Sequence, residues 1–158
     1  MKFAFALTLF TFSAGAQTVP GPPPAQPLPF SHKAHVDANL ECRLCHTNPD
    51  PGRYMGIMPA TECMSCHKGI SPDDPVVRTL TALAKKKQTI NWVRVYEIPT
   101  FVKFSHRTHV ARGLECDACH GPVATRNQLA REGNISQLAC VECHTTNKVE
   151  FNCALCHD

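Results

Sequence analysis

All ten cysteines of this 158-residue chain belong to five copies of one pattern, Cys-x-x-Cys-His. Two thiols three positions apart can form thioethers with the two vinyl groups along one edge of a porphyrin, and the adjacent histidine can ligate the iron. The pattern therefore predicts five covalently attached haem c groups. The predicted attachment residues are Cys42, Cys45, Cys63, Cys66, Cys116, Cys119, Cys140, Cys143, Cys153 and Cys156, and the predicted proximal ligands are His46, His67, His120, His144 and His157.

Other uses of paired cysteines explain less of the sequence. A zinc ribbon is built from Cys-x-x-Cys units but needs no histidine after each of them. A disulfide scaffold also leaves the five histidines without a role, and a thioredoxin-like redox site needs one such pair in a βαβ setting. Covalent haem is therefore the favoured interpretation.

The remaining four histidines lie in two copies of a short phrase, Phe-Ser-His-x-x-His-Val, which begins at residues 30 and 104. Residues 30–46 and 104–120 are identical at ten of seventeen positions, so the repeat includes a Cys-x-x-Cys-His unit. The two histidines of a phrase share one helical face at different heights, so one segment can ligate two irons. Asn39 and Gly113 occupy the same repeat position, and both residue types tolerate a left-handed turn. The predicted distal ligands are His32, His35, His106 and His109.

The phrase followed by Cys-x-x-Cys-His units resembles the multihaem class III cytochromes c, the cytochrome c3 and c7 family, over residues 30–69 and 104–157. The resemblance implies that the first histidine of each phrase ligates the haem attached immediately after it. It implies that the second histidine serves a more distant haem, and it leaves open which of those at Cys63, Cys140 and Cys153 are served. Residues 91–99 also resemble exported multihaem cytochromes that pass electrons between membrane complexes.

Five haems need five distal ligands, and the two phrases supply four histidines. Met55 and Met58 lie just before Cys63, and Met58 is the first choice for the missing ligand. A vacant or water-bound iron is the alternative. The choice matters because a methionine ligand raises the reduction potential, whereas an open iron can bind small molecules.

The N-terminus has the pattern of an export signal. Lys2 precedes an apolar run over residues 3–12, and Ala14-Gly15-Ala16 forms an A-x-A cleavage pattern before Gln17. The apolar run is shorter than the roughly 20 residues that a membrane-spanning helix needs. We therefore predict cleavage near Ala16 and a periplasmic or otherwise exported protein, without a transmembrane segment after cleavage.

These patterns divide the chain into a signal peptide (1–16), a proline-rich linker (17–29), a dihaem module (30–70), a connecting segment (71–103) and a trihaem module (104–158). The connecting segment is predicted to contain a helix over about 74–87, whose Lys85–Lys87 form a solvated end, and an extended stretch over 90–102. A second short helix is predicted around 123–131. The expected fold is mostly irregular with short α-helices and little or no β-sheet, cored by haem as in the c3 and c7 cytochromes.

The predicted function is electron transfer between redox protein partners, either membrane-bound or periplasmic oxidoreductases, through closely packed and mostly bis-histidine haems. A formal charge of +3 and the lack of a long basic tract give no support to nucleic-acid binding. We predict a carrier and not an enzyme. The alternative is a multihaem reductase or a ligand sensor that uses one haem with an open or weakly ligated iron.

Overall fold

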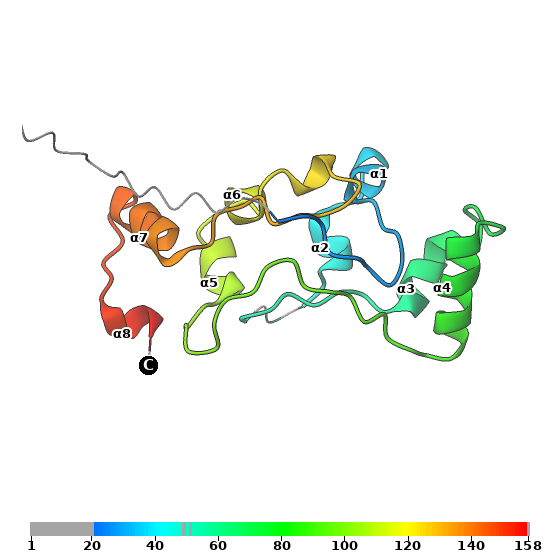
Figure 1. The fold of residues 1–158 in the computed structure, drawn as a ribbon, viewed down its shortest axis with the longest axis horizontal. Helices are drawn as coiled ribbons and strands as arrows, with labels where there is room; N and C mark the ends of the chain where they lie inside the picture. The colour runs from blue at the N-terminus through cyan, green and yellow to red at the C-terminus, as the bar shows by residue number, and fades with distance from the viewer. Residues whose placement is uncertain (1–20, 49, 51, 158) are drawn as a thin grey trace, which may run out of the picture.

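The computed structural model describes residues 21–48, 50 and 52–157, which form short helices joined by irregular segments (Figure 1). In this part of the chain the only β-type pairing is an isolated antiparallel bridge between Val102 and His157, so the predicted fold class is confirmed. The predicted signal peptide lies outside the described residues. The helices are α1 His32–Asp37, α2 Cys42–Cys45, α3 Ala60–His67, α4 Pro75–Lys85, α5 His106–Val110, α6 Asp117–His120, the 3-10 turn η1 Val123–Thr125, α7 Gln137–Thr146 and α8 Cys153–Cys156.

Every Cys-x-x-Cys-His unit lies on or beside one short helix, as predicted: α2, α3, α6, α7 and α8 carry the five units in sequence order. Local capping starts two of these helices. The Ser136 hydroxyl accepts a hydrogen bond from the Ala139 N–H at the start of α7, and the Asn152 side chain accepts one from the Leu155 N–H at the start of α8. Each helix ends no more than two residues from its motif histidine, so every motif lies at the C-terminal end of its helix.

The longest helix, α4, forms where the sequence predicts it. The Asp74 carboxylate accepts hydrogen bonds from the Val76 and Val77 N–H groups, and Pro75 occupies the first turn. Helix α4 packs against α3, and Leu80 joins Ala60 and Leu28 in a small apolar core. Leu28 comes from the proline-rich segment, so residues 21–29 wrap against the molecule.

The helix predicted around 123–131 is wrong, because only the turn η1, Val123–Thr125, forms there. At Arg126 the backbone becomes extended, with φ −105° and ψ 130°. Its carbonyl accepts a hydrogen bond of 3.0 Å from the Lys33 N–H of α1. This long-range bond takes the place of a helical one, and it holds residues 123–127 against the first histidine phrase.

The described residues form only a thin core: the buried apolar side chains are Leu28, Ala60, Val77 and Leu80. Leu138 is 64% exposed and Phe101 is 61% exposed, although both are large and apolar. Helices α3 and α4 form one end of the elongated molecule, and α7 and α8 form the other (Figure 1). None of the described helices has the length and hydropathy required to span a bilayer. A polypeptide core this small fits a fold whose interior is completed by prosthetic groups.

Candidate metal centres

The five Cys-x-x-Cys-His units are called motifs 1 to 5 below, in sequence order: residues 42–46, 63–67, 116–120, 140–144 and 153–157. None of the ten cysteines forms a disulfide with another, so all ten are available for haem attachment. The histidines that face each motif, and the contacts that orient those histidines, define the candidate centres.

In both copies of the phrase, the phenylalanine orients the two histidines in the same way. The Phe30 ring stacks on His35, with centroids 4.4 Å apart, and meets His32 edge-on at 4.8 Å. In the second copy, the centroid distances from Phe104 to His109 and to His106 are both 4.8 Å, with the same stacked and edge-on geometry. One side chain thus fixes two imidazoles pointing in different directions. Sequence reasoning assigned no role to the phenylalanine, although its identity in both copies was the available signal.

Backbone carbonyls fix the tautomer of four histidines, three from the phrases and one, His46, from motif 1. A carbonyl oxygen only accepts, so the ring nitrogen facing it, Nδ1, donates and the other nitrogen, Nε2, keeps a lone pair for a metal. The phrase also supplies its own acceptors, because the second histidine of each copy bonds to the serine carbonyl four residues earlier. The Nδ1-to-oxygen distances are 2.7 Å for His35 to Ser31, 2.8 Å for His109 to Ser105, 3.0 Å for His46 to Gly56 and 3.0 Å for His106 to Gly52.

Three predicted distal histidines face a motif histidine. The centroid distances are 6.1 Å for His35 with His67, 6.2 Å for His106 with His120 and 6.2 Å for His109 with His144. A metal-bound imidazole nitrogen lies about 2.0–2.1 Å from the metal, so two rings on opposite sides of one metal have centres about 6 Å apart. The observed spacing therefore fits two axial ligands of one haem iron.

His32, the fourth predicted distal histidine, has His46 of motif 1 and His35 as its charged neighbours. Burial, together with the neighbouring charges of His46 and His35, lowers the pKa of His32 to about 4. Burial also lowers the pKa of His120, with further contributions from His106 and His46. Both imidazoles are therefore neutral at neutral pH, which is the form that ligates a metal. The first histidine of each phrase thus lies beside the motif that immediately follows it.

Motif 5 differs from the others. The ring that contacts His157 is that of Phe101, with centroids 5.9 Å apart, whereas His35, His106 and His109 face motifs 2, 3 and 4. The predicted ligand Met58 lies elsewhere, because its backbone N–H donates to the Cys45 carbonyl of motif 1 at 2.8 Å. Ligation by Met58 stays a prediction that this placement does not favour.

His67 of motif 2 has one feature that the other ligand candidates lack. Among the described residues, its Nδ1 is the buried side-chain nitrogen or oxygen that makes no hydrogen bond. Imidazoles whose Nδ1–H donates to a carbonyl are held in orientation and are stronger donors to a metal. His67 is the last residue of α3, and α3 packs against α4.

The motifs follow one another in a single order that differs from their order in the sequence. Burial raises the pKa of five cysteine thiols, and for four of them the next cause is a thiol of another motif: Cys45 acts on Cys63, Cys42 on Cys116, Cys143 on Cys119, and Cys119 with Cys156 on Cys140. These neighbours join motif 2 to 1, 1 to 3, 3 to 4 and 4 to 5. Their helices lie along the long axis in this order, from α3 through α2 and α6 to the end that α7 and α8 share (Figure 1).

Tyr96 and Gly133 brace the central motif 3, and sequence reasoning did not predict this contact. The Tyr96 hydroxyl donates to the His120 carbonyl at 2.8 Å and accepts from the Gly133 N–H at 2.9 Å. The Tyr96 ring also meets the His120 ring edge-on at 4.7 Å. Gly133 lies so close to the motif that a Cβ atom there would overlap the Cys119 carbonyl. No local sequence pattern predicts these contacts, because they join residues far apart in the chain.

Repeated Cys-x-x-Cys-His helices, paired imidazoles and a thin polypeptide core define a multihaem c-type cytochrome. A family model described as cytochrome c3 matches residues 34–121, and one described as cytochrome c7 and related cytochrome c matches residues 102–158. The first match covers more than half of the chain, and the chain belongs to the cytochrome c3 family. It is thus an electron-transfer protein that carries covalently bound haem c.

A relative with a curated name is the multiheme cytochrome c subunit of menaquinone reductase from Nitratidesulfovibrio vulgaris (strain Hildenborough). The two chains are 35% identical over 97 residues, which is 60% of this chain and 45% of the relative. The aligned region therefore spans less than half of the relative's length.

Proposed function

We propose that this protein is an exported electron carrier with five haem c groups, four of which are held between two histidines. The observation that carries the proposal is the set of facing imidazoles with ring centres 6.1–6.2 Å apart. The proposed axial pairs are His32 with His46, His35 with His67, His106 with His120, and His109 with His144. A haem bound at each motif would supply a one-electron redox centre.

In the proposed arrangement, the five haems would follow one another in a fixed order along the molecule. Neighbouring motifs have thiols close enough to influence one another, in the order 2, 1, 3, 4 and 5. An electron that enters at either end then has a neighbouring centre to move to at every step. The proposed direction of transfer is along the long axis, between the α3–α4 end and the α7–α8 end.

The contacts around the histidines are suited to repeated oxidation and reduction. Four Nδ1 atoms donate to backbone carbonyls, and Phe30 and Phe104 pack against both histidines of their phrases. Imidazoles fixed in this way move little when the iron changes charge, so the cost of reorganisation is low.

We also propose that the partners are other redox proteins, either membrane-bound or periplasmic oxidoreductases. Two observations support this. The N-terminal sequence has an export-signal pattern, and the relative with 35% identity is by name a cytochrome subunit of a menaquinone reductase. In such an assembly this chain would pass electrons, and the reaction with the quinone would belong to a partner.

The test is to express the full chain with c-type haem maturation, isolate the exported form, and determine its mass and spectra. We expect five haems per chain and a cleaved N-terminus before Gln17. Replacing both cysteines of one motif by serine, in five separate variants, is expected to remove one haem each time. A wild-type protein with fewer than five haems, or a motif variant that retains all of its haem, would refute the assignment.

A further inference from the structure

We infer that the haem attached at motif 5 has one open axial position, which binds a small exogenous ligand at the C-terminal end of the haem file. The inference rests on the proposed function, because it requires a haem at that motif. The ligand count leaves one of the five haems without a distal histidine but does not say which, and the inference assigns that haem to motif 5. It also adds a second activity to electron transfer, which is reversible ligand binding at one terminal iron.

The first argument is the use of the four free histidines. Three of them, His35, His106 and His109, have ring centroids 6.1–6.2 Å from the histidines of motifs 2, 3 and 4, and the fourth, His32, lies on α1, far from helix α8 of motif 5 (Figure 1). His157 of motif 5 is in ring contact with Phe101, whose side chain has no atom that ligates a metal. In the proposed pairing, motifs 1 to 4 have both axial imidazoles and motif 5 has one.

The second argument concerns the methionines, because methionine is the side chain that pairs with histidine on the iron of many c-type cytochromes. Met58 is fastened to motif 1, because its N–H donates to the Cys45 carbonyl. Met55 precedes Gly56, whose carbonyl accepts from the His46 Nδ1 of the same motif at 3.0 Å. In the proposed pairing, His32 and His46 occupy both axial positions at motif 1, so no position is left there for a methionine thioether.

Met64 is also committed elsewhere. It lies between the two cysteines of motif 2 and packs against the core under α4, and its sulfur accepts a hydrogen bond of 3.6 Å from the Thr81 hydroxyl. Helix α3, which carries Met64, and helix α8 of motif 5 lie at opposite ends of the molecule (Figure 1).

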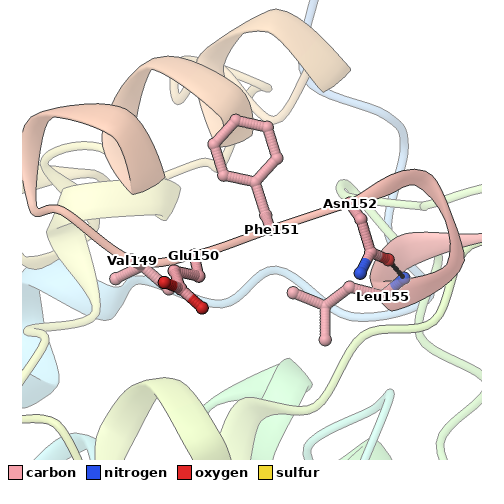
Figure 2. Close-up of a pocket in the computed structure, with 5 residues that line it drawn as sticks. All are labelled: Val149, Glu150, Phe151, Asn152 and Leu155. Carbon is pink, nitrogen blue, oxygen red and sulfur yellow. Dashed lines mark hydrogen bonds between the residues drawn. The ribbon is translucent and has the colours of Figure 1, made fainter.

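The third argument concerns the residues beside motif 5. The segment that joins α7 to α8 lines a hollow with Val149, Glu150, Phe151, Asn152 and Leu155 (Figure 2). Its lining contains no imidazole and no thioether. The Asn152 oxygen is occupied by the Leu155 N–H at 3.0 Å.

The chemistry that this arrangement permits is ligand exchange. A haem held there by His157 alone would exchange small ligands without electron transfer: carbon monoxide would donate a lone pair to ferrous iron, and hydrogen cyanide would release its proton to solvent on binding ferric iron as cyanide. Carbon monoxide is the probe for ferrous iron, and cyanide is the probe for ferric iron. A single histidine on the opposite side is the ligation used by haem proteins that bind small molecules.

The experiment uses the full, haem-loaded protein. In the oxidised protein, electron paramagnetic resonance is expected to give one high-spin iron among low-spin ones, and the reduced protein is expected to bind one carbon monoxide per chain. The double variant Cys153→Ser/Cys156→Ser should lose both signals. The matched control, Cys63→Ser/Cys66→Ser, also removes one terminal haem but should still bind one carbon monoxide.

Three outcomes would overturn the inference and leave the proposed function standing. The first is a five-haem protein in which every iron is low-spin and no carbon monoxide binds. The second is a high-spin centre that appears only after Met55→Leu or Met58→Leu, together with loss of a sulfur-to-iron charge-transfer band. The third is carbon monoxide binding that survives removal of the motif 5 cysteines. A wild-type chain without haem at motif 5 would instead refute the five-haem proposal itself.

Discussion

In the first copy of the phrase, the Ser31 hydroxyl accepts a hydrogen bond of 3.0 Å from the Ala34 N–H and so caps α1, whereas Ser105 makes no side-chain cap at the start of α5. The two copies also serve different kinds of helix. His35 faces α3, which buries Ala60 and packs against α4, and His109 faces α7, which has no buried residue. The two copies of the phrase therefore have the same internal geometry but lie in different surroundings.

Each copy is also braced by backbone from the other half of the chain. The Lys33 N–H of α1 donates to the Arg126 carbonyl at 3.0 Å, while the Gly52 carbonyl accepts from the N–H and the Nδ1 of His106, at 2.9 and 3.0 Å. Arg53 adds to the second brace by donating to the Val102 carbonyl at 2.7 Å. The comparison teaches that duplication preserved the ligand geometry, and that the supports around each copy are separate.

The largest difference between the copies should follow from removing the second histidine. His35→Ala and His109→Ala should each leave one iron with a single axial imidazole and add one high-spin centre. Because α7 has no apolar support of its own, His109→Ala should lower the free energy of unfolding by on the order of 3 kcal/mol or more, and His35→Ala by distinctly less. Chemical denaturation of the haem-loaded proteins measures both. Equal losses would mean that the α3–α4 core does not support motif 2.

The sequence was sufficient for the motifs, the repeat, α4 and the left-handed residues, since Asn39 and Gly113 have φ of 60° and 77°. These features depend on local residue types. The partners of His35 and His109 could not be predicted, because they depend on how distant helices meet. The sequence also could not show that the carbonyls of Gly52 and Gly56 accept hydrogen bonds from histidines, since every residue has a carbonyl and only the fold selects one.

The second prediction tests the brace at the central motif, between the two copies. Gly133→Ala places a Cβ where the Cys119 carbonyl lies, so the backbone must move. We expect a loss of about 2–4 kcal/mol and poorer haem incorporation at motif 3. Gly69→Ala is the matched control, because its Cβ would meet nothing nearer than the Cys66 carbonyl at 3.9 Å. Both proteins can be compared by unfolding and by haem content, and a Gly133→Ala protein as stable as the control would contradict the brace.

The third prediction tests the apolar support behind the first copy. Leu80→Ala removes a buried side chain that packs with Leu28 and Ala60, and it should lower the free energy of unfolding by about 2–3 kcal/mol. The control is Leu138→Ala on α7, where the side chain is 64% exposed. That change should stay within about 0.5 kcal/mol. If the two substitutions had the same effect, the proposed difference between the α3–α4 end and the α7–α8 end would not hold.

The smallest effect is the most specific test of the two copies, because it changes the same residue at the same repeat position. Ser31→Ala removes the hydroxyl that caps α1 and should lower the free energy of unfolding by about 1 kcal/mol, whereas Ser105→Ala removes no cap and should change it by much less. The Ser31 hydroxyl also donates to the Asn127 side chain at 2.8 Å, so its loss weakens the contact between α1 and residues 123–127. The spin state should not change in either variant, because the carbonyls of Ser31 and Ser105, which accept from His35 and His109, are retained. A larger loss for Ser105→Ala would reverse the inequality inferred from the two caps.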